Sequence, residues 1–231
     1  MSGHSKWSTI KHKKAVRDHA RGNLFTKAAK NIAVAVKKGN SPDPEANFSL
    51  RLAIDQARAI NMPKDNIERA IEHGAGRAGG QELEELVLEA YGEGGVGVII
   101  QVVADNRNRA VAEIKNILEK GGGRLVEPGS VMYQFDTVAW IEVTPILNDE
   151  DQLTLIDVGA FGFEQEEKAM VITCDPSSAQ AVTAQLVSMG YAPTTVTIGY
   201  TPKTQSTLQA GGVELVEALL AHDDVQGVYT T

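Results

Sequence analysis

The chain has 231 residues, 42% of them hydrophobic and 23% charged, and a formal net charge of −8. This composition is typical of a soluble globular protein, and the length favours two or three small domains. The single cysteine, Cys174, excludes an internal disulfide, and the charged first twenty residues lack the apolar stretch of a secretory signal. The longest apolar run, residues 96–104, is too short to span a bilayer. We therefore expect a cytoplasmic protein with no membrane partner.

Charge is distributed unevenly along the chain. Ten of the 22 Lys and Arg residues lie in the first forty positions, where Asp18 is the only acid. Residues 1–78 carry a balance of +8, and residues 79–231 carry one of −16. Such a head attracts a polyanion while the rest of the chain repels one, so nucleic acid is the first candidate partner. The alternative is that the basic arm folds back onto its own acidic body.

Residues 1–22 are polar, basic and poor in apolar anchors, which predicts an arm that is weakly ordered until it meets a partner. Its cations suit phosphates, and its histidines become better hydrogen-bond donors when protonated. Trp7 either stacks on a base or fills a seam between helices. The candidate nucleic-acid contacts of the arm are His4, Lys6, Trp7, Lys11, His12, Lys13, Lys14, Arg17 and Arg21.

Residues 23–38 have helical periodicity, with apolar residues on one side and lysines on the opposite side. Gly39 is expected to cap the end of this helix. The lysine stripe is either a solvated face or a continuation of the basic arm toward phosphate. On the second interpretation, Lys27 and Lys30 are further candidate contacts.

Two more helices are predicted before residue 75. Residues 41–44 form a turn in which Asp43 can cap, and Pro44 can begin, a second helix with a buried stripe over residues 50–60. Pro63 begins a third helix, which ends at Gly74 and leads into a Gly-rich linker. Three helices with short connections predict a small bundle or a helix-turn-helix-like unit.

After residue 81 the hydrophobic period becomes strand-like. From residue 139 the order is strand, helix, strand, strand, helix, strand, which is typical of a ferredoxin-like domain. The last helix and strand are expected to return to the first sheet. The predicted strands are 85–91, 96–103, 130–135, 139–143, 161–166, 169–173, 194–200 and 225–229, and the helices are 107–120, 150–158, 177–189 and 212–220.

These elements predict an α+β fold with three domains. The first is a three-helix domain at residues 1–78 that includes the basic arm. The second is a middle α/β domain formed by residues 79–135 and 205–231. The third is a ferredoxin-like α/β domain at residues 136–204, inserted into the middle one. Both α/β domains are expected to contain antiparallel sheets.

Catalysis and cofactor binding are not expected. Gly92, Gly94 and Gly97 satisfy the dinucleotide-binding spacing, but they lead into a strand, whereas that fingerprint requires a helix N-terminus for the pyrophosphate. The five histidines lack metal-ligand spacing, and the sequence suggests no nucleophile with an adjacent base. We therefore predict no enzyme activity, no metal and no small-molecule substrate.

Arg107 and Arg109 are unusual because they fall in the first turn of a predicted helix, where the helix dipole disfavours cations. Asp105 or Asn106 is a suitable N-cap for that helix. The unfavourable interaction of the two arginines with the helix dipole is offset either by a carboxylate of the chain or by an external phosphate that also binds the helix N-terminal amides. In the second case both arginines are nucleic-acid contacts.

Several unusual strings resemble the YebC/PmpR family, whose relatives include the mitochondrial translational activator of cytochrome c oxidase. They run along nearly the whole chain. They are GHSKW at 3–7, KHKKA at 11–15, RG at 21–22, FTK at 25–27, NMPKDNIERAI at 61–71, GAG at 74–76, YGEGGVGVII at 91–100, DNRNRAVAEI at 105–114, GSVMYQF at 129–135 and DDVQGVYT at 223–230.

The resemblance implies a cytoplasmic three-domain protein and a DNA-binding transcriptional regulator. It also implies an alternative, because other members are implicated in translation, where they relieve ribosome stalling at proline-rich stretches. The charge pattern does not separate DNA from ribosomal or transfer RNA. A third possibility is an interaction module whose arm docks on its own body.

Overall fold

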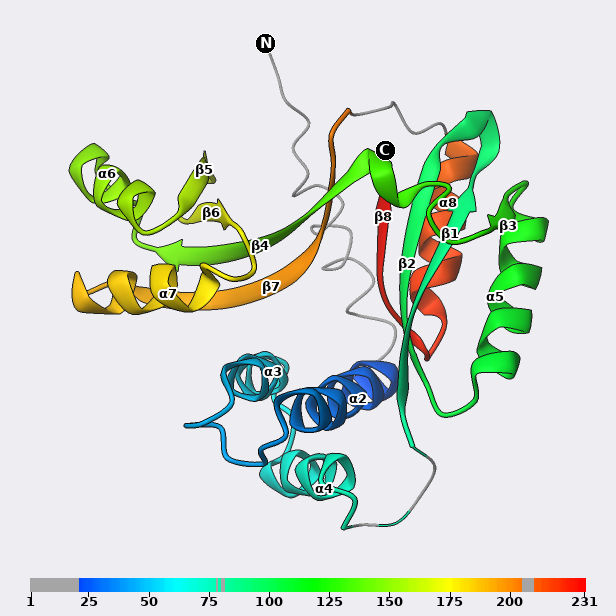
Figure 1. The fold of residues 1–231 in the computed structure, drawn as a ribbon, viewed down its shortest axis with the longest axis horizontal. Coiled ribbons are helices and arrows are strands. Elements are labelled where there is room, and N and C mark those ends of the chain that lie inside the picture. Colours follow the sequence, from blue (N-terminus) through cyan, green and yellow to red (C-terminus); the bar gives the residue numbers. More distant parts are fainter. Residues whose placement is uncertain (1–20, 78, 80–81, 205–209) are drawn as a thin grey trace. The chain divides into compact units, whose positions relative to one another are not determined.

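The computed structural model describes residues 21–77, 79, 82–204 and 210–231 (Figure 1). The predicted arm before residue 21 lies outside the described residues, as do residues 78, 80 and 81 of the predicted linker. The chain forms two compact units, which we call unit 1 (Met1–Asp136 with Thr201–Thr231) and unit 2 (Thr137–Tyr200). In the described part of the chain, no helix is both long and apolar enough to cross a membrane.

Unit 1 begins with a bundle of three helices, α2 (Arg21–Gly39), α3 (Phe48–Ala59) and α4 (Lys64–Gly74). The prediction that the second helix starts at Pro44 is wrong. The side chain of Asn47 accepts a hydrogen bond from the backbone N–H of Leu50 and so sets the first turn of α3. The core of the bundle consists of Ile32, Ala35, Val36, Leu50, Ala53, Ile54, Ala57, Met62, Ile67 and Ala70.

The same unit contains a four-stranded sheet in the order β3-β1-β2-β8. Its strands are β1 (Glu84–Tyr91), β2 (Gly97–Ala104), β3 (Arg124–Val126) and β8 (Val225–Thr230), and its helices are α5 (Arg107–Lys120) and α8 (Ala210–Ala221). The predicted return of the last strand to the first sheet is confirmed, because β8 pairs antiparallel with β2. The boundary proposed at residue 78 stays a prediction, since the bundle and this sheet belong to one unit.

Apolar side chains of the sheet and its two helices form one continuous core. The strands contribute alternate residues such as Val98, Ile100 and Val102, and α5 contributes Ile114 and Leu118. The end of α5 is fixed by a Schellman motif, in which the N–H of Gly123 donates to the carbonyl of Leu118 over 2.8 Å and Gly122 takes a φ of +73°.

Residues 130–134 do not form the predicted strand. The backbone N–H groups of Gly129, Val131 and Met132 donate to the carboxylate of Glu89 over 2.6, 2.6 and 2.9 Å instead of to a neighbouring strand. The segment is therefore a turn followed by the short 3₁₀ helix η2 (Met132–Gln134). Burial of Glu89 acts to raise its pKa, but the three backbone donors outweigh burial and hold the pKa below its usual value.

Unit 2 has the predicted ferredoxin-like topology, which confirms the α+β fold. Its strand order is β5-β6-β4-β7, and β6 pairs antiparallel with both β4 and β5. The core includes Ile141, Leu155, Ile172, Val182 and Leu186. The elements are β4 (Phe135–Thr144), α6 (Asp149–Asp157), β5 (Ala160–Gln165), β6 (Met170–Cys174), α7 (Ala179–Ser188) and β7 (Ala192–Pro202).

Cys174 is expected to resist alkylation while unit 2 is folded. It is fully buried at the end of β6, and burial, with a smaller contribution from the charge of Asp175, raises the pKa of its thiol to about 11. At pH 8, iodoacetamide should label the native protein far more slowly than the protein in 6 M guanidinium. Mass spectrometry measures both rates. Equal rates would contradict the buried position of Cys174.

Candidate nucleic-acid interface

Eight of the thirteen predicted contacts precede residue 21 and lie outside the described residues: His4, Lys6, Trp7, Lys11, His12, Lys13, Lys14 and Arg17. Arg21 is the first residue of α2. The remaining four are Lys27 and Lys30 of α2 and Arg107 and Arg109 of α5. For these four, the structure gives contacts within unit 1.

Lys27 and Lys30 reach the connection between α8 and β8. The Lys27 Nζ atom donates to the carbonyl oxygen of Leu220 over 2.6 Å, at the C-terminal end of α8, where the helix dipole favours a cation. The Lys30 ammonium forms an ion pair with Asp224 and is also 3.4 Å from the carbonyl oxygen of Asp223. Neither lysine belongs to a purely solvated face.

The other two lysines of the predicted stripe also contact the body of unit 1. Lys37 lies 2.6 Å from Glu82, and Lys38 lies 3.4 Å from Glu85, at the start of β1. Both pairs are exposed, so each contributes little to stability. Still, all four lysines of α2 contact carbonyls or carboxylates in the sheet part of unit 1. Helix α2 is therefore attached to the acidic part of its own chain.

Asp224 joins the bundle to the sheet. Its side chain is only 3% exposed, and its carboxylate accepts hydrogen bonds from Lys30 and, over 3.0 Å, from the Nη2 atom of Arg109. Burial acts to raise the pKa of Asp224, but the two cations outweigh it, and the pKa lies below its usual value. One buried carboxylate therefore holds cations from two separate helices.

The arginines at the start of α5 are offset by carboxylates of the chain, which is one of the two alternatives. Arg109 contacts Asp105 over 2.7 Å as well as Asp224, and Arg107 contacts Glu84 over 3.1 Å. Asn106 is the N-cap, and its side chain accepts from the N–H of Arg109 over 3.0 Å. Sequence reasoning missed the central partner, Asp224.

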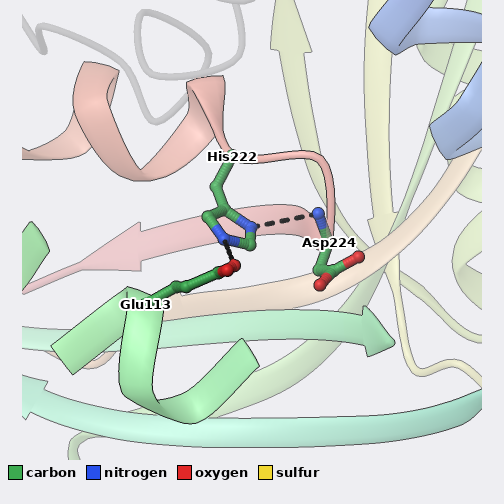
Figure 2. Close-up of side chains that lie close together, drawn as sticks. All are labelled: Glu113, His222 and Asp224. Atoms are coloured by element: carbon green, nitrogen blue, oxygen red, sulfur yellow. Dashed lines mark hydrogen bonds and ion pairs between the residues drawn. The ribbon is translucent and has the colours of Figure 1, made fainter. Parts of the chain in front are cut away.

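Polar side chains from α2, α5 and the α8–β8 connection surround an open cleft of about 480 Å³. It contains a cluster of three possible metal ligands whose ligand atoms lie within 4.8 Å of one another. Figure 2 shows the three residues, with the ring of His222 between Glu113 and Asp224. The residues lining the cleft are Thr26, Lys30, Arg109, Glu113, Ala221, His222, Asp223 and Asp224.

The hydrogen bonds of this cluster do not suit a metal ion. The backbone N–H of Asp224 donates to His222 Nδ1 over 3.1 Å, which assigns the ring proton to Nε2, and Nε2 then donates to Glu113 over 2.8 Å. A metal-bound histidine also donates one N–H to a neighbouring group, but its other nitrogen must offer a free lone pair to the metal, and here the Nδ1 lone pair accepts the N–H of Asp224. The carboxylate of Asp224 is already held by two cations. The cluster is a hydrogen-bonded support for the α8–β8 connection.

Comparisons with known proteins match nearly the entire chain. Residues 5–77 match the model described as the TACO1/YebC protein N-terminal domain, and residues 83–231 match the TACO1/YebC second and third domain. A probable transcriptional regulatory protein of Thermomicrobium roseum is 44% identical, with coverage of 100% of this chain and 95% of that protein. One of Brachyspira hyodysenteriae is 40% identical, with coverage of 100% and 96%.

A solved structure gives the same result for the fold. The crystal structure of a conserved hypothetical protein from Aquifex aeolicus superimposes with a TM-score of 0.85 and 38% sequence identity, covering 98% of this chain and 96% of that one. Both the sequence and the architecture agree over almost the full length. The chain belongs to the TACO1/YebC family.

Proposed function

We propose that this protein is a cytoplasmic DNA-binding transcriptional regulator that grips phosphates through the basic arm at its N-terminus. The observation that carries the proposal is the density of cations: six Lys and Arg residues among residues 1–22 against a single acid. The names of the relatives, which are probable transcriptional regulatory proteins, support it. Because these relatives are named as regulatory proteins, we propose binding rather than catalysis.

The contacts within unit 1 support assigning this role to some of the cations rather than to all of them. The four lysines of α2 and Arg109 have carboxylate or carbonyl partners in the body, and engaging DNA would require giving these up. Arg107 is 62% exposed and could turn to a phosphate at little cost. We therefore assign the main phosphate contacts to Lys6, Lys11, Lys13, Lys14, Arg17 and Arg21, with Trp7, His4 and His12 beside them.

Neutralising the arm should abolish most of the DNA affinity. The variant Lys11→Ala, Lys13→Ala, Lys14→Ala is expected to bind a 30-bp duplex about tenfold or more weakly at 100 mM salt, because three phosphate neutralisations are lost. Fluorescence anisotropy measures the affinity. The matched control, Lys115→Ala, Lys120→Ala, Lys168→Ala, makes the same change in net charge at exposed positions outside the head and should retain near-native affinity.

The same titration with RNA separates this proposal from the alternative of a ribosome-associated translation factor. Equal loss of affinity in the two triple variants would contradict the assignment to the arm. Binding to structured RNA that is much tighter than binding to duplex DNA, together with co-sedimentation with ribosomes, would contradict the assignment to transcription.

A further inference from the structure

Unit 2 concentrates both negative charge and exposed apolar side chains. Residues 137–200 hold nine acids and one base, Lys168, so this unit alone has the net charge of the whole chain, −8. Of the seven large hydrophobic residues that are exposed in the described chain, five lie in this unit: Leu153, Ile156, Phe161, Val187 and Ile198. Exposed apolar side chains among carboxylates are typical of an interaction surface rather than of a surface that only contacts water.

Three of these apolar residues lie on α6 and β5, which follow each other in the chain. Leu153 and Ile156 are three residues apart, so they share one side of α6, and they are 64% and 49% exposed. Helix α6 packs against β5 (Figure 1), and Gly159, with a φ of +107°, lies in the turn between them. Phe161, the second residue of β5, is 60% exposed.

Carboxylates border these apolar side chains. Asp149 and Glu150 lie one helical turn before Leu153, and Asp157 lies one turn after it. We call this set the acidic–apolar surface; its members are Asp149, Glu150, Leu153, Ile156, Asp157 and Phe161.

The backbone next to this surface can accept another strand. β5 lies at one end of the order β5-β6-β4-β7, and among the described strands it pairs with β6 alone. The outer edge of such a strand presents N–H and C=O groups to an extended peptide, while neighbouring side chains select the residues of that peptide.

The charge of unit 2 decides which class of partner fits. Nucleic acid and anionic membranes are repelled by nine carboxylates, and unit 2 of a second copy is repelled by the same charge. A cationic partner is attracted, and apolar side chains on it would cover Leu153, Ile156 and Phe161. We propose that the acidic–apolar surface binds an extended Lys/Arg-rich polypeptide segment that also carries apolar side chains. This inference does not rest on DNA binding by the head.

Three ten-residue peptides test the proposal on the full-length protein: (Lys-Val)₅, (Lys-Ser)₅ and (Glu-Val)₅. In amide NMR titrations, (Lys-Val)₅ should shift the resonances of α6 and β5 and bind about tenfold more tightly than (Lys-Ser)₅, because the valines cover apolar surface. The (Glu-Val)₅ peptide should not bind. Comparable affinity for (Lys-Ser)₅, or shifts confined to other elements, would overturn the proposal.

Two variants of unit 2 and one control complete the test. Leu153→Ser with Phe161→Ser, and separately Asp149→Asn, Glu150→Gln with Asp157→Asn, should each weaken (Lys-Val)₅ about tenfold or more. All five positions are at the surface, so the fold is retained. The control Glu119→Gln, Glu127→Gln, Glu217→Gln removes three exposed acids of unit 1 and should leave the affinity unchanged. Equal weakening by the control, or dimerisation through this surface in sedimentation velocity, would overturn the proposal.

Discussion

Replacing Glu89 with Gln is expected to destabilise unit 1 by about 3 kcal/mol, because hydrogen bonds to a charged acceptor are strong and their buried donors cannot be left unpaired. The carboxylate accepts three backbone N–H groups from residues 129–132 and is 5% exposed. The glutamine side chain keeps one acceptor oxygen, and its NH₂ group faces backbone N–H donors that it cannot accept from. Hydrogen exchange of the β1 and β2 amides measures the loss of protection.

The pH dependence of stability provides a second measurement at Glu89. Its pKa in the folded protein lies below the ordinary value of 4.5, so its contribution is complete above that value and is lost as the pH falls through the folded pKa. The difference between wild type and Glu89→Gln should therefore be constant above about pH 5 and shrink in acid. Glu85→Gln, on the same strand but with an exposed side chain, is the control and should cost less than about 0.5 kcal/mol. Equal effects of the two substitutions would contradict this role of Glu89.

Replacing Asp224 with Asn should loosen the attachment of the helical bundle and cost about 2 kcal/mol. This loss of stability is smaller than the loss expected on breaking a fully buried ion pair, because Arg109 is 47% exposed and can turn to water. Most of the loss arises at Lys30, whose side chain is only 16% exposed. Amide exchange should increase mainly in α2 and in the α8–β8 connection. The neighbouring Asp223→Asn makes the same charge change at an exposed position and should cost less than about 0.5 kcal/mol.

Lys30 distinguishes a structural role from a phosphate contact. If Lys30 serves the ion pair with Asp224, then Lys30→Met should lower stability and be non-additive with Asp224→Asn, while the salt dependence of DNA binding stays as in wild type. Additive effects on stability combined with a reduced salt dependence would contradict the structural role and restore Lys30 as a phosphate contact.

Much of the fold could be predicted because its elements have strong local signals. α5 occupies the predicted range, since apolar spacing, an Asn N-cap and a Gly-rich end all agree at residues 106–123. The ferredoxin-like unit followed from the order of its periodic segments. β3 was missed because three residues are too few to establish a period.

The errors arose where a distant residue decides the local structure. Residues 130–135 alternate like a strand, yet the N–H groups of Gly129, Val131 and Met132 bond to Glu89, about forty positions earlier. The lysine stripe of α2 could be identified, but its partner could not, because Lys30 and Asp224 are 194 residues apart. Periodicity indicates which side of a helix is polar; it does not indicate whether water, phosphate or a carboxylate lies opposite.

These contacts separate two groups of cations in the first forty residues. Lys27, Lys30, Lys37 and Lys38 attach α2 to the acidic sheet part of unit 1, and Arg21 and the cations that precede it are assigned to nucleic acid. On this division, carboxylates of the chain pair with some cations of the head, while the cations of the arm remain available to bind nucleic acid.

The salt dependence of duplex DNA binding tests this division most directly. If about five phosphates are neutralised, log K should fall with log salt at a slope near −4.5, and the Lys11→Ala, Lys13→Ala, Lys14→Ala variant should show a slope of about −2. The Lys30→Met variant should keep the wild-type slope. A wild-type slope near zero, or an unchanged slope in the arm variant, would contradict the account.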